Sequence, residues 1–228
     1  MDKNKKIKIE KNGPYRVSGN IPLEKEFVVP DENNNPLSWQ KGEKYKTEEE
    51  YCLCRCGKSQ NKPFCDFTHQ KIEFDGTETA SKEDYKQQAE NISGPGMDLM
   101  DASNLCARAR FCHRHGGTWD LTAKSDDSKS KKIAIEEACN CPSGRLTAIN
   151  KKTGEPIEPE FSPSISITED IPAKASGPLW AKGKIQIEGA DGSSYENRNR
   201  QTICRCGKSS NKPFCDGSHI ENKFDDKV

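Results

Sequence analysis

The chain has 228 residues, of which 31% are hydrophobic and 32% charged. Its formal net charge is 0, and its mean hydropathy is −0.98. A chain without excess basic charge is not expected to bind nucleic acid or an anionic membrane. Because so few residues are apolar, something besides a large hydrophobic core must stabilise the fold.

The sequence predicts a cytoplasmic protein. Its longest apolar run is 51–54, which is too short for a transmembrane helix, and no secretory signal follows the first six residues. Eleven cysteines are present, an odd number. In a reducing compartment, clustered cysteines are expected to bind metal before they form disulfides.

An internal repeat organises the chain. Residues 54–69 and 204–219 are identical at thirteen of sixteen positions. The repeat extends upstream, because 13–23 matches 177–187 and Tyr45 and Tyr195 each precede the first motif cysteine by nine residues. The first copy carries 14 extra residues, since Gly13 to Cys54 spans 41 positions and Gly177 to Cys204 spans 27. We expect the extra length to form a surface loop near 30–35.

The predicted elements follow in chain order. Residues 15–23 and 179–187 are typical of short strands split by glycine turns. Between the copies, the pattern predicts a helix over 82–91 with Ser81 as its N-cap, a strand at 97–100, a helix at 131–138 and a strand at 146–149. Arg198 and Arg200, just before the second motif, are expected to be exposed, where they could steer an acidic redox partner.

The second motif brings four potential metal ligands into one short segment, and Gly207 permits a sharp turn after the first two, Cys204 and Cys206. The other two, Cys215 and His219, are four residues apart, so one turn of helix would place them on one face. The first copy has the same four ligands, at Cys54, Cys56, Cys65 and His69.

Three thiolates and one imidazole can bind tetrahedral zinc, or a 2Fe–2S cluster in which each iron takes two protein ligands. Structural zinc sites usually have two residues between paired cysteines rather than one, which weakens the zinc interpretation and leaves it open. Cys52 has Thr202 as its counterpart, so we interpret Cys52 as an ordinary half-buried residue.

The segment from Cys204 to His219, with its Cys-Asp-Gly-Ser-His run at 215–219, resembles the signature of the CDGSH iron-sulfur (mitoNEET-like) family. The resemblance implies a 2Fe–2S cluster held by three Cys and one His beneath a small β-sandwich cap. The first copy has Phe67 in place of the glycine, which is expected to change the exposure and lability of its cluster. The family pairs two such units about a two-fold axis. The two copies could therefore form an intramolecular pseudo-dimer, or pair between chains.

A histidine ligand has a physical consequence. Replacing a fourth thiolate by neutral imidazole makes the site less negative by one charge, which raises the reduction potential. Protonation of the histidine should also make cluster retention depend on pH. His219→Cys is therefore expected to lower the potential and to slow cluster loss in acid.

The central cysteines form a third candidate site. Cys106 and Cys112 are separated by five residues, with Ala109 at the middle-cysteine position of a bacterial ferredoxin run, and Cys141 precedes a proline. Roughly residues 97–150 resemble the divergent mono-cluster 4Fe–4S domain that accompanies CDGSH motifs. With Cys139 as the fourth ligand this implies a 4Fe–4S cluster, and without it a 3Fe–4S cluster.

The sequence thus predicts an α+β protein, with two β-rich CDGSH-type units at 1–80 and 166–228 flanking a ferredoxin-like segment at 81–165. We expect one-electron transfer through three iron–sulfur centres, with redox partner proteins and no enzymatic substrate pocket. The alternatives are cluster storage, donation to apo-acceptor proteins or redox sensing, and a zinc-stabilised interaction module.

Overall fold

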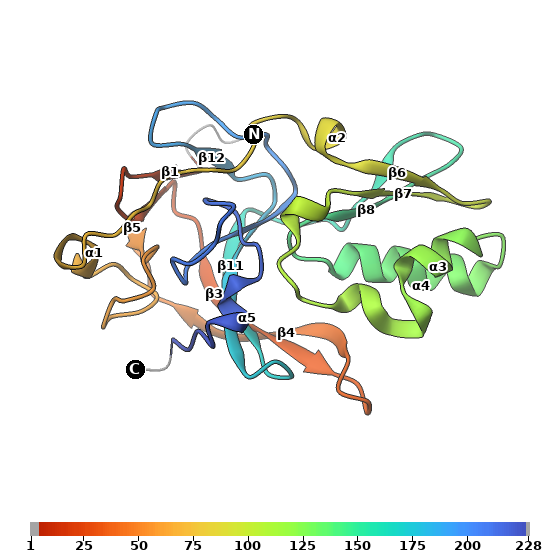
Figure 1. Cartoon of the computed structure of the whole chain (residues 1–228), viewed down its shortest axis with the longest axis horizontal. Helices are drawn as coiled ribbons and strands as arrows, with labels where there is room; N and C mark the ends of the chain where they lie inside the picture. Colours follow the sequence, from red (N-terminus) through yellow and green to blue (C-terminus); the bar gives the residue numbers. More distant parts are fainter. Residues whose placement is uncertain (1–4, 227–228) are drawn as a thin grey trace.

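The computed structural model describes residues 5–226. Its strands form three sheets, with the orders β12-β1-β2-β5, β13-β11-β10-β3-β4 and β6-β7-β8-β9 (Figure 1). The predicted α+β class is confirmed, since most of the ordered chain lies in sheets and the helices are few. The strands of the first two sheets are β1 (Lys6–Ile9), β2 (Tyr15–Ser18), β3 (Leu23–Pro30), β4 (Pro36–Tyr45), β5 (Glu50–Leu53), β10 (Ser164–Asp170), β11 (Ala175–Lys182), β12 (Gln186–Glu188) and β13 (Arg200–Ile203).

The two copies of the repeat build the same unit and exchange a strand. In the first copy β2 pairs with β5, with Tyr15 opposite Leu53, and in the second β11 pairs with β13, with Leu179 opposite Ile203. The first copy's β3 runs parallel to β10, and the second copy's β12 runs parallel to β1. The first copy therefore supplies β3 and β4 to the sheet of the second copy, and the second copy supplies β12 to the sheet of the first, so the expected stretches 1–80 and 166–228 share both sheets.

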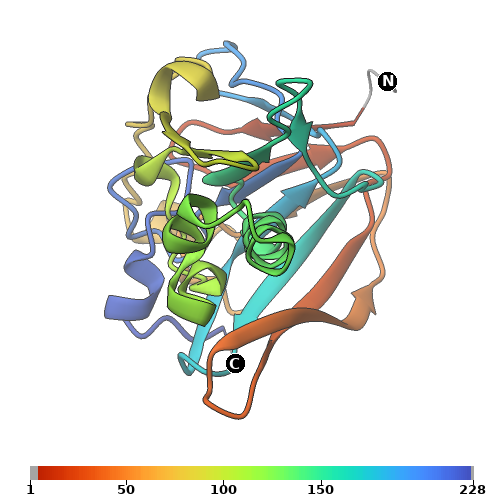
Figure 2. The ribbon, with the colours of Figure 1, turned by 90° about the vertical axis from the view of Figure 1, so that its right-hand side faces the viewer.

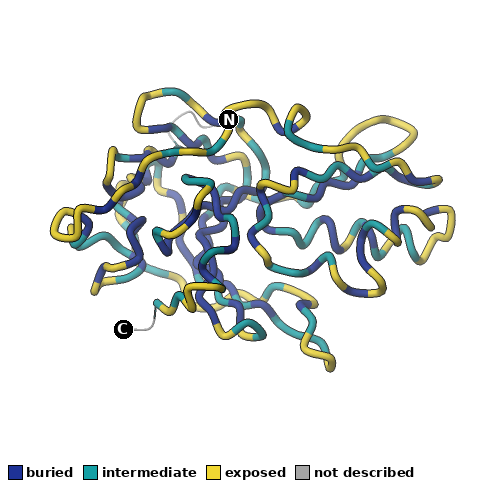
Figure 3. The backbone as a smooth tube through the Cα atoms, in the orientation of Figure 1, coloured by how far each residue is buried: buried dark blue, intermediate teal, exposed yellow. Residues whose placement is uncertain are grey.

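One hydrophobic core serves both sheets. Apolar residues alternate along β1 and β2, so Ile7, Ile9, Tyr15 and Val17 are fully buried. The same core includes buried residues of β10, β11 and β13. Figure 3 shows this buried chain in the middle of the molecule and exposed chain around its rim. Sharing one core between two copies compensates for the low apolar content.

The central segment forms the third sheet, and two helices cover one of its faces (Figure 2). Leu99 and Leu146 of this sheet pack with Ala134 and Ala138 of the longer helix. The strands expected at 97–100 and 146–149 and the helix expected at 131–138 are confirmed. The elements are β6 (Glu90–Ser93), β7 (Asp98–Asp101), β8 (Leu146–Ile149), β9 (Pro156–Ile157), the α-helices α2 (Tyr85–Gln88), α3 (Thr118–Ala123) and α4 (Ser128–Asn140), and the 3-10 segments Ser103–Leu105 and Phe111–Gly116.

The helix expected over 82–91 is wrong, because only α2 is helical there. A capping box between Asp84 and Gln87 starts this single turn. The hydroxyl of Tyr85 donates to the carbonyl oxygens of Met100 and Arg145, at 3.0 and 2.8 Å. The chain then pairs as β6 with β7, so sheet pairing overrides the local helix pattern.

The 14 extra residues of the first copy are also more ordered than expected. Only 31–35 form a turn, and the flanking residues extend β3 and β4 into a long hairpin. Trp39 on β4 donates its indole N–H to the carbonyl oxygen of Asn140 at 3.0 Å. Its ring centroid lies 5.0 Å from those of Phe111 and Trp180. The hairpin therefore packs against the central segment.

Within residues 5–226, every helix is too short or too polar to cross a membrane.

Candidate metal centres

Each motif folds back on the last strand of its unit. The backbone N–H of Cys54 donates to the oxygen of Pro63 at 2.8 Å, and that of Cys65 donates to the oxygen of Cys52 at 2.9 Å. The equivalent bonds of the second copy have the same two lengths. These bonds return the second half of the motif to the first, so ligands that are distant in sequence meet.

In each copy the four predicted ligands form two close pairs. The sulfurs of Cys54 and Cys56 are 3.8 Å apart, and the Cys65 sulfur lies 3.4 Å from Nδ1 of His69. The corresponding distances in the second copy are 3.6 and 3.4 Å. A tetrahedral metal with metal–sulfur bonds of about 2.3 Å holds two sulfurs about 3.8 Å apart. Each pair therefore has the separation that two ligands of one metal require.

The Cys–His pairs form without the shared helix that the sequence predicts. The short helices α1 (Thr68–Lys71) and α5 (Ser218–Glu221) begin after the cysteine of each pair. The residue before each helix is left-handed, with φ 67° at Phe67 and 86° at Gly217. The N–H of each of these residues donates to its motif cysteine, Cys65 or Cys215, at 3.4 Å. Such amide bonds stabilise a thiolate.

The backbone around the first cysteine of each motif also favours the thiolate. Hydrogen bonds from Cys56, and then from the backbone N–H groups of Ser59 and Gly57, lower the pKa of Cys54 to about 6. The equivalent bonds lower the pKa of Cys204 to about 6. Since metals bind thiolates rather than thiols, the first cysteine of each motif is favoured in the form that metal binding needs. The hydrogen bond with that first cysteine, and then burial, raise the pKa of Cys56 and of Cys206.

The two centres differ in exposure. At the first, His69 is 8% exposed, Cys65 is partly exposed, and the neighbouring Phe67 is 59% exposed. At the second, Cys215 is 2% and His219 is 3% exposed. The same ligand set therefore lies near solvent in one copy and inside the protein in the other.

Residues 106–110 of the central segment cause this difference, because they lie on the second motif. A Cβ at Gly217 would overlap the side chain of Arg108. Arg108 also pairs with Glu221 of α5, with 2.5 Å between Nη1 and Oε1. Burial, and then the positive charge of Arg205, lower the pKa of His219 to about 4.

The two motifs themselves lie back to back. A Cβ on Gly57 would meet the backbone of Cys206, and a Cβ on Gly207 would meet the backbone of Cys56. Both glycines have positive φ, 74° and 76°. Glycine is needed at both positions for the turn and for this close approach.

The structure brings Cys106, Cys112 and Cys141 together around a cavity of about 20 Å³, which Ala109 and Arg145 also line. Arg145 donates to Asp101 at 2.6 and 2.8 Å. These bonds, with a smaller contribution from the charge of Cys106, raise the pKa of Arg145 above its usual range. A fixed positive charge therefore lies beside one thiol of this set.

Cys139 does not line this cavity. Its thiol faces the oxygen of Ile157 at 3.6 Å, on the side of α4 that meets β9. Cys139 lies within α4, whereas Cys141 is the extended residue just after it and lines the cavity. The exposed His113 and His115 and the half-buried Cys52 also lie outside the three ligand sets.

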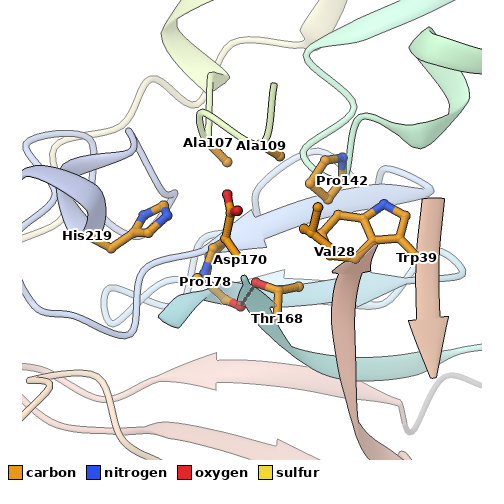
Figure 4. Close-up of a pocket in the computed structure, with 10 residues that line it drawn as sticks. Val28, Trp39, Ala107, Ala109, Pro142, Thr168, Asp170, Pro178 and His219 are labelled. Atoms are coloured by element: carbon orange, nitrogen blue, oxygen red, sulfur yellow. Dashed lines mark hydrogen bonds between the residues drawn. The ribbon is translucent and has the colours of Figure 1, made fainter. Parts of the chain in front are cut away.

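The second and central centres are neighbours. A cavity of about 10 Å³ separates them, with His219 on one side and Ala107 and Ala109 on the other (Figure 4). The carboxylate of Asp170 lies in the same gap and accepts two hydrogen bonds from Arg110, at 2.7 and 2.8 Å. This pair attaches the central loop to β10, beside the second centre.

Arg198 and Arg200 are not the exposed residues that the sequence suggests. Arg200 is 1% exposed and donates to the carbonyl oxygens of Ala138 and Cys141, at 2.6 and 2.7 Å. Arg198 donates to Ser143 at 2.8 Å. Both attach the central segment to the second unit, a role that requires long-range contacts and that local sequence does not reveal.

Comparison with protein families matches the three regions in which these candidate ligand sets lie. The family described as iron-binding zinc finger CDGSH type matches residues 12–70 and 176–220. The family described as divergent 4Fe-4S mono-cluster matches residues 92–151. No curated protein and no solved structure is significantly similar to the chain.

Proposed function

We propose that this chain transfers single electrons between partner proteins. The chain carries two CDGSH-type iron-binding regions around a divergent 4Fe-4S mono-cluster region. In this proposal each CDGSH-type region holds a 2Fe–2S cluster, and the central segment holds a 4Fe–4S or 3Fe–4S cluster. Bound iron–sulfur clusters supply one-electron redox chemistry. The chain's own residues provide the ligands, limit access of water and set the separation of the centres.

The division of each motif into two donor pairs carries the 2Fe–2S assignment. Within residues 5–226, no three Cys, His, Asp or Glu side chains converge on one ion. A structural zinc ion takes four ligands on one centre, whereas each iron of a 2Fe–2S cluster takes two protein ligands. The division of the four ligands into two pairs therefore supports the cluster over the zinc module, while the pair distances of 3.4–3.8 Å suit two ligands of either metal.

The central site offers three thiolates, from Cys106, Cys112 and Cys141. Ala109 occupies the position where a ferredoxin run has its remaining cysteine. Three protein ligands suit a 3Fe–4S cluster, or a 4Fe–4S cluster with one ligand from outside the chain. Arg145 would stabilise the negative charge of either.

The packing of the three centres supports electron transfer in a linear order. The central loop packs on the second motif, and the second motif packs on the first. Only the first centre has a strongly exposed residue, Phe67, at the position before its short helix. We propose that electrons pass between the central and first centres by way of the buried second one.

Cluster donation is the second candidate, favoured by the exposure of the first centre. A carrier cycles between redox states with its iron retained, whereas a donor loses iron and sulfide to an apo-acceptor. Repeated reduction and oxidation, with iron measured after each cycle, separates the two.

We propose a carrier in the cytosol rather than an enzyme. The cysteines of this chain are free thiols, which suits a reducing compartment.

The test is iron, acid-labile sulfide and zinc per chain on anaerobically purified protein, with EPR of oxidised and reduced samples. About eight irons with near-equal sulfide would support two 2Fe–2S centres and one 4Fe–4S centre. About seven irons, with a signal already present in the oxidised protein, would indicate 3Fe–4S. Zinc without sulfide, in protein from iron-supplemented cells, would overturn the proposal.

A further inference from the structure

The pseudo-symmetry of the two motifs allows their outer faces to be compared position by position. At the second centre, residues 106–110 of this chain cover that face, and Gly217 is buried beneath Arg108. The equivalent face of the first centre is open. Phe67 is 59% exposed and Ile72 is 46% exposed, one at each end of α1. These are two of the four exposed large hydrophobic residues among those described.

The stability of this chain does not explain why an exposed phenylalanine occupies position 67. Its φ of 67° is left-handed, which costs about 1–2 kcal/mol for a residue other than glycine. Its high exposure means that little apolar surface is buried in return. Its ring centroid lies 6.0 Å from that of His69, so whatever contacts Phe67 comes close to a ligand of the first centre. An unusual backbone conformation held at a functional site is a reason to look for a role there.

The charge of this face is reversed relative to its covered counterpart. Glu221 of the second copy pairs with Arg108 of the central loop, and Lys71 occupies the equivalent position in the first copy. A partner that covered the first centre in the same way would present a carboxylate to Lys71. Segment 57–73 has three lysines and two carboxylates, so it is positively charged within a chain of net charge 0.

We propose that the surface formed by Lys58, Phe67, Lys71 and Ile72 docks an acidic redox protein. Its carboxylates would face the two lysines, and an apolar patch would contact Phe67 and Ile72. The proposal rests on the proposed electron transfer and adds the docking site and the charge of the partner. In the transfer, one electron leaves the reduced protein, which is thereby oxidised, and reduces the partner, and no covalent bond forms or breaks.

The test compares two one-electron acceptors of opposite charge, plant plastocyanin, which is acidic, and cytochrome c, which is basic. Dithionite-reduced protein, freed of reductant, is mixed with each acceptor in a stopped-flow instrument. We expect the Lys58→Glu/Lys71→Glu variant to reduce plastocyanin about tenfold more slowly at low salt and cytochrome c faster. Both effects should fade at about 0.5 M salt, where charges are screened.

Lys208→Glu is the matched control, because Lys208 is exposed at the position of the second motif equivalent to Lys58. It should change either rate less than about twofold. Phe67→Gly should slow plastocyanin reduction at every salt concentration, because it removes an apolar contact. If Lys208→Glu acts as strongly as the double variant, or neither has an effect, the docking surface is wrong while electron transfer stands.

Carbodiimide cross-linking tests the docking surface separately from the proposed electron transfer, because it joins lysines to nearby carboxylates without any electron transfer. We expect cross-links of plastocyanin to concentrate at Lys58 and Lys71, and to require Phe67 for full yield. Cross-links spread evenly over the lysines of the chain would overturn the docking surface. Failure to reduce plastocyanin, cytochrome c or ferricyanide would instead overturn the proposed function.

Discussion

The two CDGSH-type motifs hold nearly the same residues in nearly the same geometry, yet they have different surroundings. Their Cys–His pairs have equal separations of 3.4 Å, and their helices both follow a left-handed residue. At that residue the first copy has an exposed Phe67, and the second has Gly217 beneath the central loop. A ligand set is therefore specified locally, whereas its access to solvent and to partners depends on distant parts of the chain.

The largest effect is expected from a substitution that removes the attachment of the central segment to the second unit. Arg200 is buried there, while its counterpart Glu50 in the first copy is exposed. Arg200→Met would remove the guanidinium that donates to the carbonyl oxygens of Ala138 and Cys141 and pairs with the carboxylate of Glu158. We expect a loss of about 3–5 kcal/mol in the free energy of unfolding, measured by denaturant titration.

Glu50→Met serves as the matched control, with an expected change within about 0.5 kcal/mol. Equal effects of the two substitutions would show that the central segment does not depend on Arg200.

Exchanging the two residues before the helices tests the comparison directly. Gly217→Phe places a ring where Arg108 packs, so we expect a loss of about 2–4 kcal/mol. Phe67→Gly relieves the left-handed conformation of an exposed residue, and we expect a gain of about 1 kcal/mol. Thermal unfolding of the metal-loaded protein measures both, and changes of the same sign would contradict the assigned environments.

The third prediction concerns acid. The pKa of His219 is lowered to about 4 by burial and Arg205, whereas histidine in an unfolded chain titrates near 6.5. As pH falls through this window the unfolded chain binds a proton that the folded chain does not, so stability decreases. His219→Cys should slow the acid loss of visible absorbance from the second centre and lower its reduction potential.

His69→Cys reports on the first centre in the same assay. Identical potentials and decay rates in the wild-type protein and the His219→Cys variant would contradict the role of this histidine.

The smallest effect is expected from substituting Cys139, which lies outside the central ligand set. Cys139→Ser should keep the full iron content, because the Cys139 thiol faces Ile157. Cys141→Ser should lose the iron of the central centre and keep that of the other two. Iron and sulfide assays measure the cluster content of both variants. Equal losses of iron in the two variants would show that Cys139 is also a ligand.

Local pattern predicted the parts of the molecule that depend on neighbouring residues. The repeat predicted both four-ligand sets, and the local pattern located β8 and most of α4. The different directions of Cys139 and Cys141 could not be predicted in this way, because both residues follow the helix expected at 131–138.

The remainder depends on contacts between distant segments. The strand exchange and the packing of the β3–β4 hairpin on Asn140 each involve residues more than a hundred positions away. The hydrogen bonds that bury Arg200 reach residues 42 to 62 positions away. The helix expected over 82–91 failed for a more local reason, because β6 pairs with the next strand, β7. Whether a motif is exposed to solvent or covered by another segment also depends on contacts between segments that are distant in the sequence.

The strand exchange also has a consequence for how the protein is made. Residues 6–8 pair with residues 186–188, so the first sheet cannot close until most of the chain has left the ribosome. Contacts of such large sequence separation slow folding and leave strand edges exposed meanwhile. The first motif therefore emerges early but waits for the end of synthesis before its surrounding sheet is complete, and metal insertion into its native setting is expected to be a late event.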